Sequence, residues 1–162
     1  MKVIVYTSNA GSTKQYAELL SEKTKAPVFD FSSDEIPENA EVIYLGWVMG
    51  GDIQGLSKAR ERFGSLKAVV AVGMMISEKT KSEVIEKNKI GEPFFYIPGE
   101  FNIKKLKGMY KMMMSMMLRM MKGKVKESAD PDDKRALELF ESGFNGVKEE
   151  NLEPIIDSIF NE

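Results

Sequence analysis

The chain has 162 residues, 43% of them hydrophobic and 30% charged, which is the size and balance of one globular domain with its own core. It contains neither cysteine nor histidine. Disulfides, thiolate nucleophiles, Cys/His zinc sites and a Ser-His-Asp triad are therefore excluded. Redox chemistry in this chain requires a bound organic cofactor.

Charge is unevenly spread along the chain. An apolar run directly follows Met1-Lys2, and no stretch of about 18 uncharged apolar residues occurs, so we expect a cytoplasmic protein without a signal peptide. Residues 101–126 contain eight basic side chains and no acidic one: Lys104, Lys105, Lys107, Lys111, Arg119, Lys122, Lys124 and Lys126. Since the whole chain carries -2 and this segment +8, the remainder carries -10. The segment is a candidate surface for an anionic partner.

Strand-like and helix-like segments alternate over the first hundred residues. Short apolar and β-branched runs predict strands at 2–6, 27–31, 41–46, 66–72 and 93–97. Amphipathic spacing predicts helices at 12–25, 55–63 and 78–88, with about one helical turn in 34–38. Because several of the strands are apolar throughout, we expect an α/β fold with a parallel sheet covered by helices on both faces.

The alternation stops after the fifth predicted strand. The sequence predicts a long methionine-rich helix at 103–122, and a second helix that begins after Asp130-Pro131 and ends near residue 142. A last amphipathic helix is predicted at 151–160. No repeat or long linker is present, so we expect a single domain over 1–162, with 101–148 as a helical insertion before the last helix.

The turn between the first strand and the first helix consists mainly of small, hydroxylated and glycine residues: Thr7, Ser8, Asn9, Ala10, Gly11, Ser12 and Thr13. A terminal phosphate needs backbone N–H donors, short hydroxyl side chains and a helix N-terminus, all of which this turn supplies. The alternative is an ordinary polar turn with a Ser or Thr cap. The position of the turn favours a role in ligand binding, because open α/β sheets bind ligands at the carboxyl ends of their strands. The turn matches neither GxxxxGK[ST] nor GxGxxG, so a monophosphate fits best.

The run Ser8-Asn9-Ala10-Gly11-Ser12-Thr13 resembles the flavodoxin family signature, in which (T/S)-x-T-G-x-T follows a strand. The resemblance implies a flavodoxin-like three-layer sandwich with five parallel strands in the order 2-1-3-4-5. It also implies that this loop holds the phosphate of FMN, with the isoalloxazine ring against the loops after the third and fourth strands. Ala10 stands where the signature has a hydroxyl residue, and it cannot supply that side-chain hydrogen bond.

Two further segments are predicted as ring-facing loops. The resemblance places Gly46, Trp47, Val48, Met49 and Gly50 along the flavin, where a glycine permits a backbone group to contact N5 of the ring. Trp47 either covers the ring or packs as an ordinary tryptophan beside a turn. The second segment contains Gly73 and Met74, without the tyrosine among acidic residues that a typical flavodoxin has there. We therefore expect a more exposed, or less tightly sandwiched, ring.

Eight of the twelve methionines lie between Met109 and Met121. One narrow polar stripe on this helix is predicted by the spacing of Lys104, Lys107, Lys111, Ser115, Arg119 and Lys122. Three alternatives are open for the rest of the helix. It packs on the body or in a dimer, it forms a contact surface of adaptable methionines, or it lies at a membrane interface with its lysines toward anionic head groups.

The segment from Ile97 to Leu106 and the basic stretch after it resemble the flavodoxin-domain subfamily that includes menaquinone-dependent protoporphyrinogen oxidases. In that subfamily the segment is implicated in membrane association and activity. The resemblance implies an FMN-dependent oxidoreductase that acts with a quinone or a redox partner protein, with membrane or subunit contact through 103–126 at the inner membrane face. The alternatives are a flavodoxin-like electron carrier and a binding protein of this fold that has lost the cofactor. The sequence does not identify which side chains are catalytic, and we expect no metal site and no nucleic-acid partner.

Overall fold

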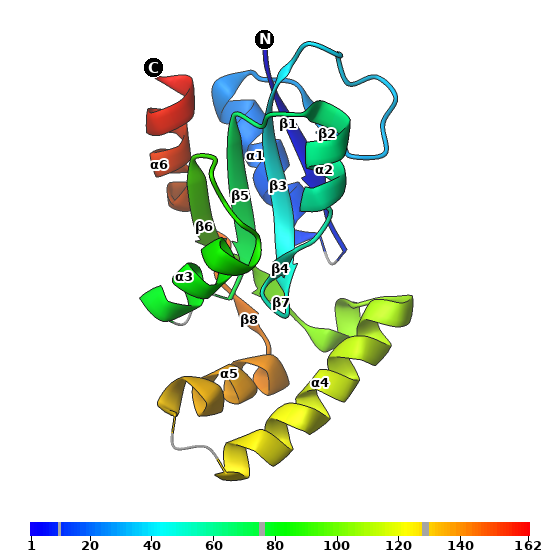
Figure 1. Cartoon of the computed structure of the whole chain (residues 1–162), viewed down its shortest axis with the longest axis vertical. Helices are drawn as coiled ribbons and strands as arrows, with labels where there is room; N and C mark the ends of the chain where they lie inside the picture. The colour runs from blue at the N-terminus through cyan, green and yellow to red at the C-terminus, as the bar shows by residue number, and fades with distance from the viewer. Residues whose placement is uncertain (10, 75–76, 128–129) are drawn as a thin grey trace.

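A sheet with five parallel strands forms the centre of the computed structural model, which describes residues 1–9, 11–74, 77–127 and 130–162 (Figure 1). Its parallel strands are β1 (Lys2–Thr7), β2 (Val28–Asp30), β3 (Glu41–Met49), β5 (Ala68–Gly73) and β6 (Phe94–Pro98). They lie in the order β2-β1-β3-β5-β6. When only the parallel strands are numbered, this is the predicted order 2-1-3-4-5. The predicted fold class and strand order are confirmed.

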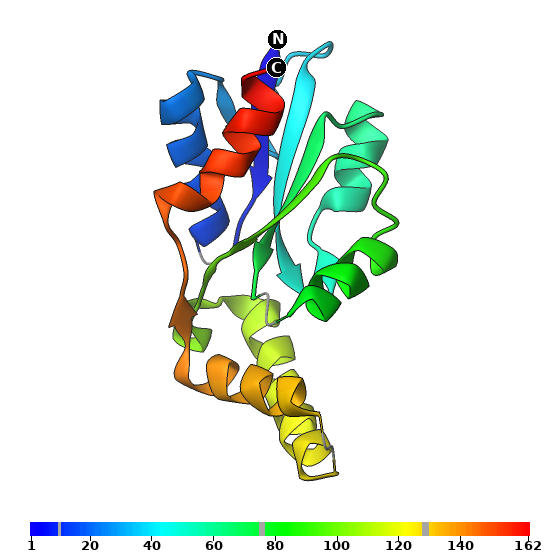
Figure 2. The ribbon, with the colours of Figure 1, turned by 90° about the vertical axis from the view of Figure 1, so that its left-hand side faces the viewer.

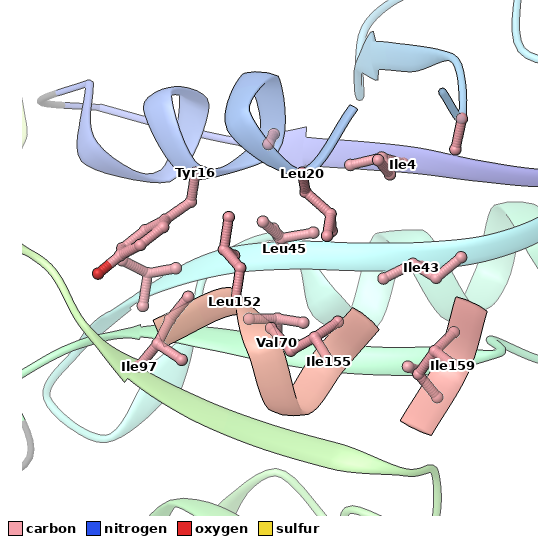
Figure 3. Close-up of a cluster of buried hydrophobic side chains, with 14 residues drawn as sticks. Ile4, Tyr16, Leu20, Ile43, Leu45, Val70, Ile97, Leu152, Ile155 and Ile159 are labelled. Atoms are coloured by element: carbon pink, nitrogen blue, oxygen red, sulfur yellow. The ribbon is translucent and has the colours of Figure 1, made fainter. Parts of the chain in front are cut away.

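Helices cover both faces of the sheet, as Figure 2 shows. On one face lie α1 (Ser12–Thr24) and α6 (Glu153–Ile155), which continues as a π-helical turn over Ile156–Phe160; on the other lie α2 (Leu56–Phe63) and α3 (Glu78–Lys87). Successive strand residues point to opposite faces, so Ile43 packs against the α1 side and Val42 against the α2 side. The core on the α1 side includes Tyr16, Leu20 and Ile155 (Figure 3).

Strand β3 is longer than predicted. It continues through Gly46, Trp47, Val48 and Met49, then turns back into the antiparallel strand β4 (Asp52–Ile53). The loop predicted at 46–49 is therefore wrong. A side chain at position 46 would place its Cβ 2.7 Å from Ile53 Cγ2, so the glycine allows β4 to approach rather than ending the strand. The helical turn predicted in 34–38 is also wrong, since these residues form no helix.

The helical insertion lies beyond the carboxyl ends of the parallel strands (Figure 1). It comprises β7 (Glu100–Phe101), a 3-10 turn (Ile103–Lys105), α4 (Gly108–Glu127), α5 (Pro131–Ser142) and β8 (Phe144–Asn145), and a second 3-10 turn (Glu149–Leu152) leads into α6. The methionine-rich helix begins later than predicted, at Gly108, whose φ is 58°. Asp130 caps α5 as predicted, since its carboxylate accepts from Asp132 N at 2.9 Å. Within the described residues, no helix is both long enough and apolar enough to cross a membrane.

Tyr16 ties α1 to both ends of the insertion. Its hydroxyl lies 2.5 Å from the carbonyl oxygen of Pro98, where the chain leaves the sheet, and 3.3 Å from that of Gly146, where the chain returns. Asn151 Nδ2 donates to the same hydroxyl at 2.8 Å. Burial raises the pKa of Tyr16, so the hydroxyl stays protonated. The helix that starts at the predicted phosphate loop therefore also positions the insertion.

Candidate functional site

A cavity of about 340 Å³ lies between the carboxyl edge of the sheet and the helices α4 and α5. This volume is within the range of small-molecule sites. Ten of the fourteen predicted site residues line it: Ser8, Asn9, Ser12, Thr13, Trp47, Val48, Met49, Gly50, Gly73 and Met74. The structure thus brings together segments that are up to about sixty residues apart in the sequence.

The other four predicted site residues are not part of the cavity wall as far as the chain is described. The Thr7 hydroxyl lies 2.9 Å from the Tyr44 hydroxyl, Gly46 is inside β3, and Gly11 is the N-cap of α1. Ala10 lies outside the described residues. Contact between these four residues and a ligand stays a prediction.

The loop before α1 presents polar groups that lack partners. Gly11, with a φ of 103°, donates from its N–H to Ser8 Oγ at 3.1 Å and shapes the loop. Gly11, the N-cap of α1, has no side chain with which to cap the first turn. In the described residues, Thr13 Oγ1 and Asn9 Oδ1 are buried without a hydrogen-bond partner. Rotation of the Asn9 amide exchanges its oxygen for a donor nitrogen. Unpartnered buried groups of this kind, beside the N-terminus of a helix, fit an anionic oxygen ligand.

Gly99 was not predicted, although the chain requires a glycine there. An added Cβ would lie 2.9 Å from Val72 Cγ1 and 3.2 Å from Ser12 Oγ. Gly73 is similarly confined, because its Cβ would lie 2.9 Å from the Tyr96 hydroxyl. These two glycines let the ends of β5 and β6 approach each other and the start of α1 closely, and Gly99 N donates to Gly73 O at 3.0 Å.

We expect Gly99→Ala to lower the free energy of unfolding by about 1 to 3 kcal/mol, because both neighbours of the new methyl group are in the packed interior. Chemical denaturation measures the effect. Gly91→Ala is a matched control, since no heavy atom lies within 4 Å of its added Cβ. Its unfolding free energy should stay within about 0.5 kcal/mol of the parent. Equal losses in the two variants would contradict the packing argument.

The roof of the cavity is apolar and comes from the insertion. Met114, Met117 and Met121 of α4 face the cavity at helical spacing. Phe101 and Phe140 pack edge to face, with ring centroids 4.9 Å apart, and both line the cavity. Sequence reasoning missed these aromatic residues, because their contact joins β7 to a helix almost forty residues later.

Contacts of more than one kind connect the roof to the sheet side of the cavity. Trp47 packs edge to face on Tyr110 of α4, with centroids 5.0 Å apart, and it also lines the cavity. Ser77 Oγ lies 3.0 Å from Asp132 Oδ2, which joins the start of α3 to α5. The roof is therefore held over the two segments that were predicted to face a ring. Met75 and Ile76, next to the second of them, lie outside the described residues.

Five of the eight methionines at 109–121 are exposed, and we call them the methionine face: Met109, Met112, Met113, Met116 and Met120. Their exposed fractions run from 41% to 72%, whereas Met114 is 3% exposed. Helix α4 thus presents one apolar side to the cavity and a second apolar side outward. Among the described residues, its own chain covers only one side of the helix, and contact of the other side with a second copy or a membrane stays a prediction.

Two tyrosines, Tyr44 in the core and the partly buried Tyr96, are expected to make the fold sensitive to alkali. Burial raises the pKa values of Tyr44 and Tyr96 to about 12. Unfolded tyrosine ionises near pH 10, so the stability that the neutral hydroxyls contribute is complete below pH 10 and is lost as pH rises toward 12. The loss is roughly 3 kcal/mol per tyrosine at most. Urea denaturation between pH 8 and pH 11.5 measures it, and Tyr96→Phe should reduce the slope. An identical slope in Tyr96→Phe would contradict this assignment.

The fold is that of an open α/β protein, and the cavity at the carboxyl edge of its sheet presents polar groups that a phosphate-bearing ligand would fit. Residues 3–128 match the family described as Flavodoxin domain, and the chain belongs to this family. Members of the family generally bind FMN, and the unpartnered Thr13 hydroxyl fits its phosphate. The findings support an FMN-binding flavodoxin-like redox protein.

A solved structure titled "Structure of a flavodoxin from the domain Archaea" is similar to this chain at 16% sequence identity and a TM-score of 0.38. The likeness covers 65% of this chain and 88% of that chain. A comparison with curated proteins finds no match. The family match ends at residue 128, so α5 and α6 lie beyond it.

Proposed function

We propose that this protein is an FMN-dependent oxidoreductase of the protoporphyrinogen-oxidase-like type, which acts with a quinone or another hydrophobic partner. The observation that carries the proposal is a single cavity that joins the polar loop before α1 to a roof of methionine and aromatic side chains. FMN supplies the electron-transfer chemistry when bound. A carrier that only docks to a protein partner does not need an apolar chamber of its own.

The residues of the cavity have separable roles in this proposal. Asn9, Ser12, Thr13 and the first N–H groups of α1 would hold the phosphate. The segments at 47–50 and 73–74 would line the ring, and Trp47, held by Tyr110, would close one side. Met114, Met117 and Met121 would keep water out and adapt to an apolar planar molecule.

Two measurements in sequence test the function. Titration of the purified protein into FMN should quench the flavin fluorescence in a saturable way. The loaded protein should then catalyse quinone-coupled oxidation of protoporphyrinogen faster than free FMN at the same concentration. Absence of quenching would reject both the oxidase and the carrier. Saturable binding with no rate above free FMN would reject the oxidase and favour the electron carrier.

The outer side of α4 supports a place for this protein at the inner membrane face. The methionine face lies on a segment with eight exposed basic residues and no acidic one. Among the described residues, only Lys105 and Lys122 of these eight are found in ion pairs, with Glu100 and Glu141. Apolar side chains among exposed cations suit the surface of an anionic bilayer. Pairing two copies through α4 would instead bring two strongly positive segments together.

A further inference from the structure

The turn between β3 and β4 is held by the end of helix α3. Gly50 and Gly51 form this turn, both with positive φ, and both line the cavity. The Lys87 ammonium donates to the carbonyl oxygen of Gly50 at 2.6 Å. Asn88 Nδ2 donates to the carbonyl oxygen of Gly51 at 2.8 Å. Each carbonyl of the turn therefore has a side-chain partner that comes from a different part of the fold.

Asn88 forms hydrogen bonds both within its own helix α3 and to strand β4. Its Nδ2 also donates to Val84 O at 2.8 Å within α3, and its Oδ1 accepts from Ile53 N at 3.0 Å in β4. Its own carbonyl oxygen accepts from Arg60 Nη1 of α2 at 2.8 Å. The hairpin is thereby connected to two helices through one side chain and its backbone.

Lys87 contacts the turn with both the methylene groups and the ammonium group of its side chain. A Cβ added to Gly51 would lie 3.2 Å from Lys87 Cδ, so the methylene groups pass close to the glycine. The ammonium also pairs with Asp52 at 3.2 Å, and Lys87 itself lines the cavity. The Lys87 ammonium therefore lies at the wall formed by the turn, beside the Asp52 carboxylate.

These contacts matter because consecutive glycines leave a turn free to change conformation. Gly50 and Gly51 have no Cβ, so many backbone conformations are open to them. The carbonyl and the N–H of one peptide unit lie in a common rigid plane, and rotation of the unit moves both. Rotation of the peptide between Gly50 and Gly51 would break the bond from Lys87, and rotation of the next one would break the bond from Asn88.

We propose that Lys87 and Asn88 are positioning residues that fix the Gly50–Gly51 turn as a rigid wall for the isoalloxazine ring. This inference rests on the proposed function. It adds that the Lys87 ammonium favours the electron-rich reduced ring over the oxidised one and so raises the midpoint potential of bound FMN. Nothing in the spacing of the sequence links position 87 to position 50.

The first test uses the FMN-free protein. Amide hydrogen exchange at residues 52–53 should become at least about tenfold faster in Asn88→Ala, because Ile53 N loses its acceptor and the turn loses a donor. Lys87→Met should accelerate exchange at Asp52, which pairs with Met49 across the turn, and should leave the parallel strands of the sheet unchanged. Lys81→Met, in the same helix but outside the cavity wall, is the control and should exchange like the parent. Parent-like exchange at the turn in both variants would overturn the positioning role.

The second test uses the FMN-loaded protein. Lys87→Met should weaken FMN binding by about three- to tenfold, a modest effect because the side chain is half exposed. It should also lower the midpoint potential, whereas Lys87→Arg should restore the parent potential and Lys81→Met should not change it. An unchanged potential in Lys87→Met would overturn the electrostatic role. Failure of the parent itself to bind FMN would reject the proposed function, while the exchange result separately decides whether the turn is held.

Discussion

Thr13→Val is expected to weaken FMN binding and, at the same time, to stabilise the FMN-free protein. Thr13 is 1% exposed, and its hydroxyl is buried without a partner in the described residues. Valine has nearly the same shape and removes that unpartnered group, so the unfolding free energy should rise by about 1 to 2 kcal/mol. A hydrogen bond to a phosphate oxygen is worth about 1.5 to 3 kcal/mol, and its loss should raise the dissociation constant about 10- to 150-fold.

This prediction is specific to a binding site, because the substitution should weaken FMN binding while it raises the free energy of unfolding. Urea denaturation without FMN and fluorescence titration with FMN measure the two effects. Thr24→Val is the matched control, because that hydroxyl lies in the same helix, donates to Leu20 O at 2.7 Å and is not part of the cavity wall. It should not change the dissociation constant. A destabilised Thr13→Val protein with parent-like FMN affinity would make Thr13 an ordinary helix residue and would remove the support for a phosphate loop.

Local patterns in the sequence were sufficient for most of the fold. The apolar runs around Ile4, Ile43 and Val70 mark strands that are buried on both sides, and Asp130-Pro131 marks a helix start. The extension of β3 was not predictable in this way. Gly46 is a typical strand breaker in sequence, and the close approach of Ile53 and of the Gln54 carbonyl oxygen in space explains its presence inside a strand.

The residues of the candidate site likewise fall into those that local sequence patterns predict and those that only the folded chain brings together. The loop at 8–13 could be predicted as a phosphate loop because hydroxyl groups and glycine between a strand and a helix have a direct chemical use, and this assignment stays a prediction. The roof was missed because Phe101 and Phe140 lie almost forty residues apart, and their contact next to the β7–β8 pair arises only in the folded chain. Periodicity did predict the polar stripe of α4, but it does not distinguish an apolar side that faces a cavity from one that faces outward.

Replacing Met112, Met116 and Met120 together by glutamine is expected to weaken binding to anionic lipid vesicles about 100-fold. These side chains are 63%, 59% and 72% exposed and lie on one side of α4. Inserting each into the acyl boundary is worth about 1 kcal/mol, so their joint loss costs about 3 kcal/mol of binding free energy. Vesicle co-sedimentation with phosphatidylserine and phosphatidylcholine measures the change, and vesicles of phosphatidylcholine alone should bind weakly in every variant.

The basic residues supply a second, separable contribution to vesicle binding. Each replacement by glutamine at Lys104, Lys107 and Lys111 should weaken the free energy of vesicle binding by about 1 kcal/mol. This loss should shrink as salt is added, because salt screens charges near a surface. The methionine loss should persist at high salt, since apolar burial is not screened. Lys58→Gln on α2 is the control, because that exposed lysine lies outside the basic segment. Unchanged vesicle binding in both triple variants would reject the membrane contact. If the parent does not bind vesicles but self-associates, and the methionine variant loses that self-association, the methionine face would be assigned to contact with a second copy of the chain.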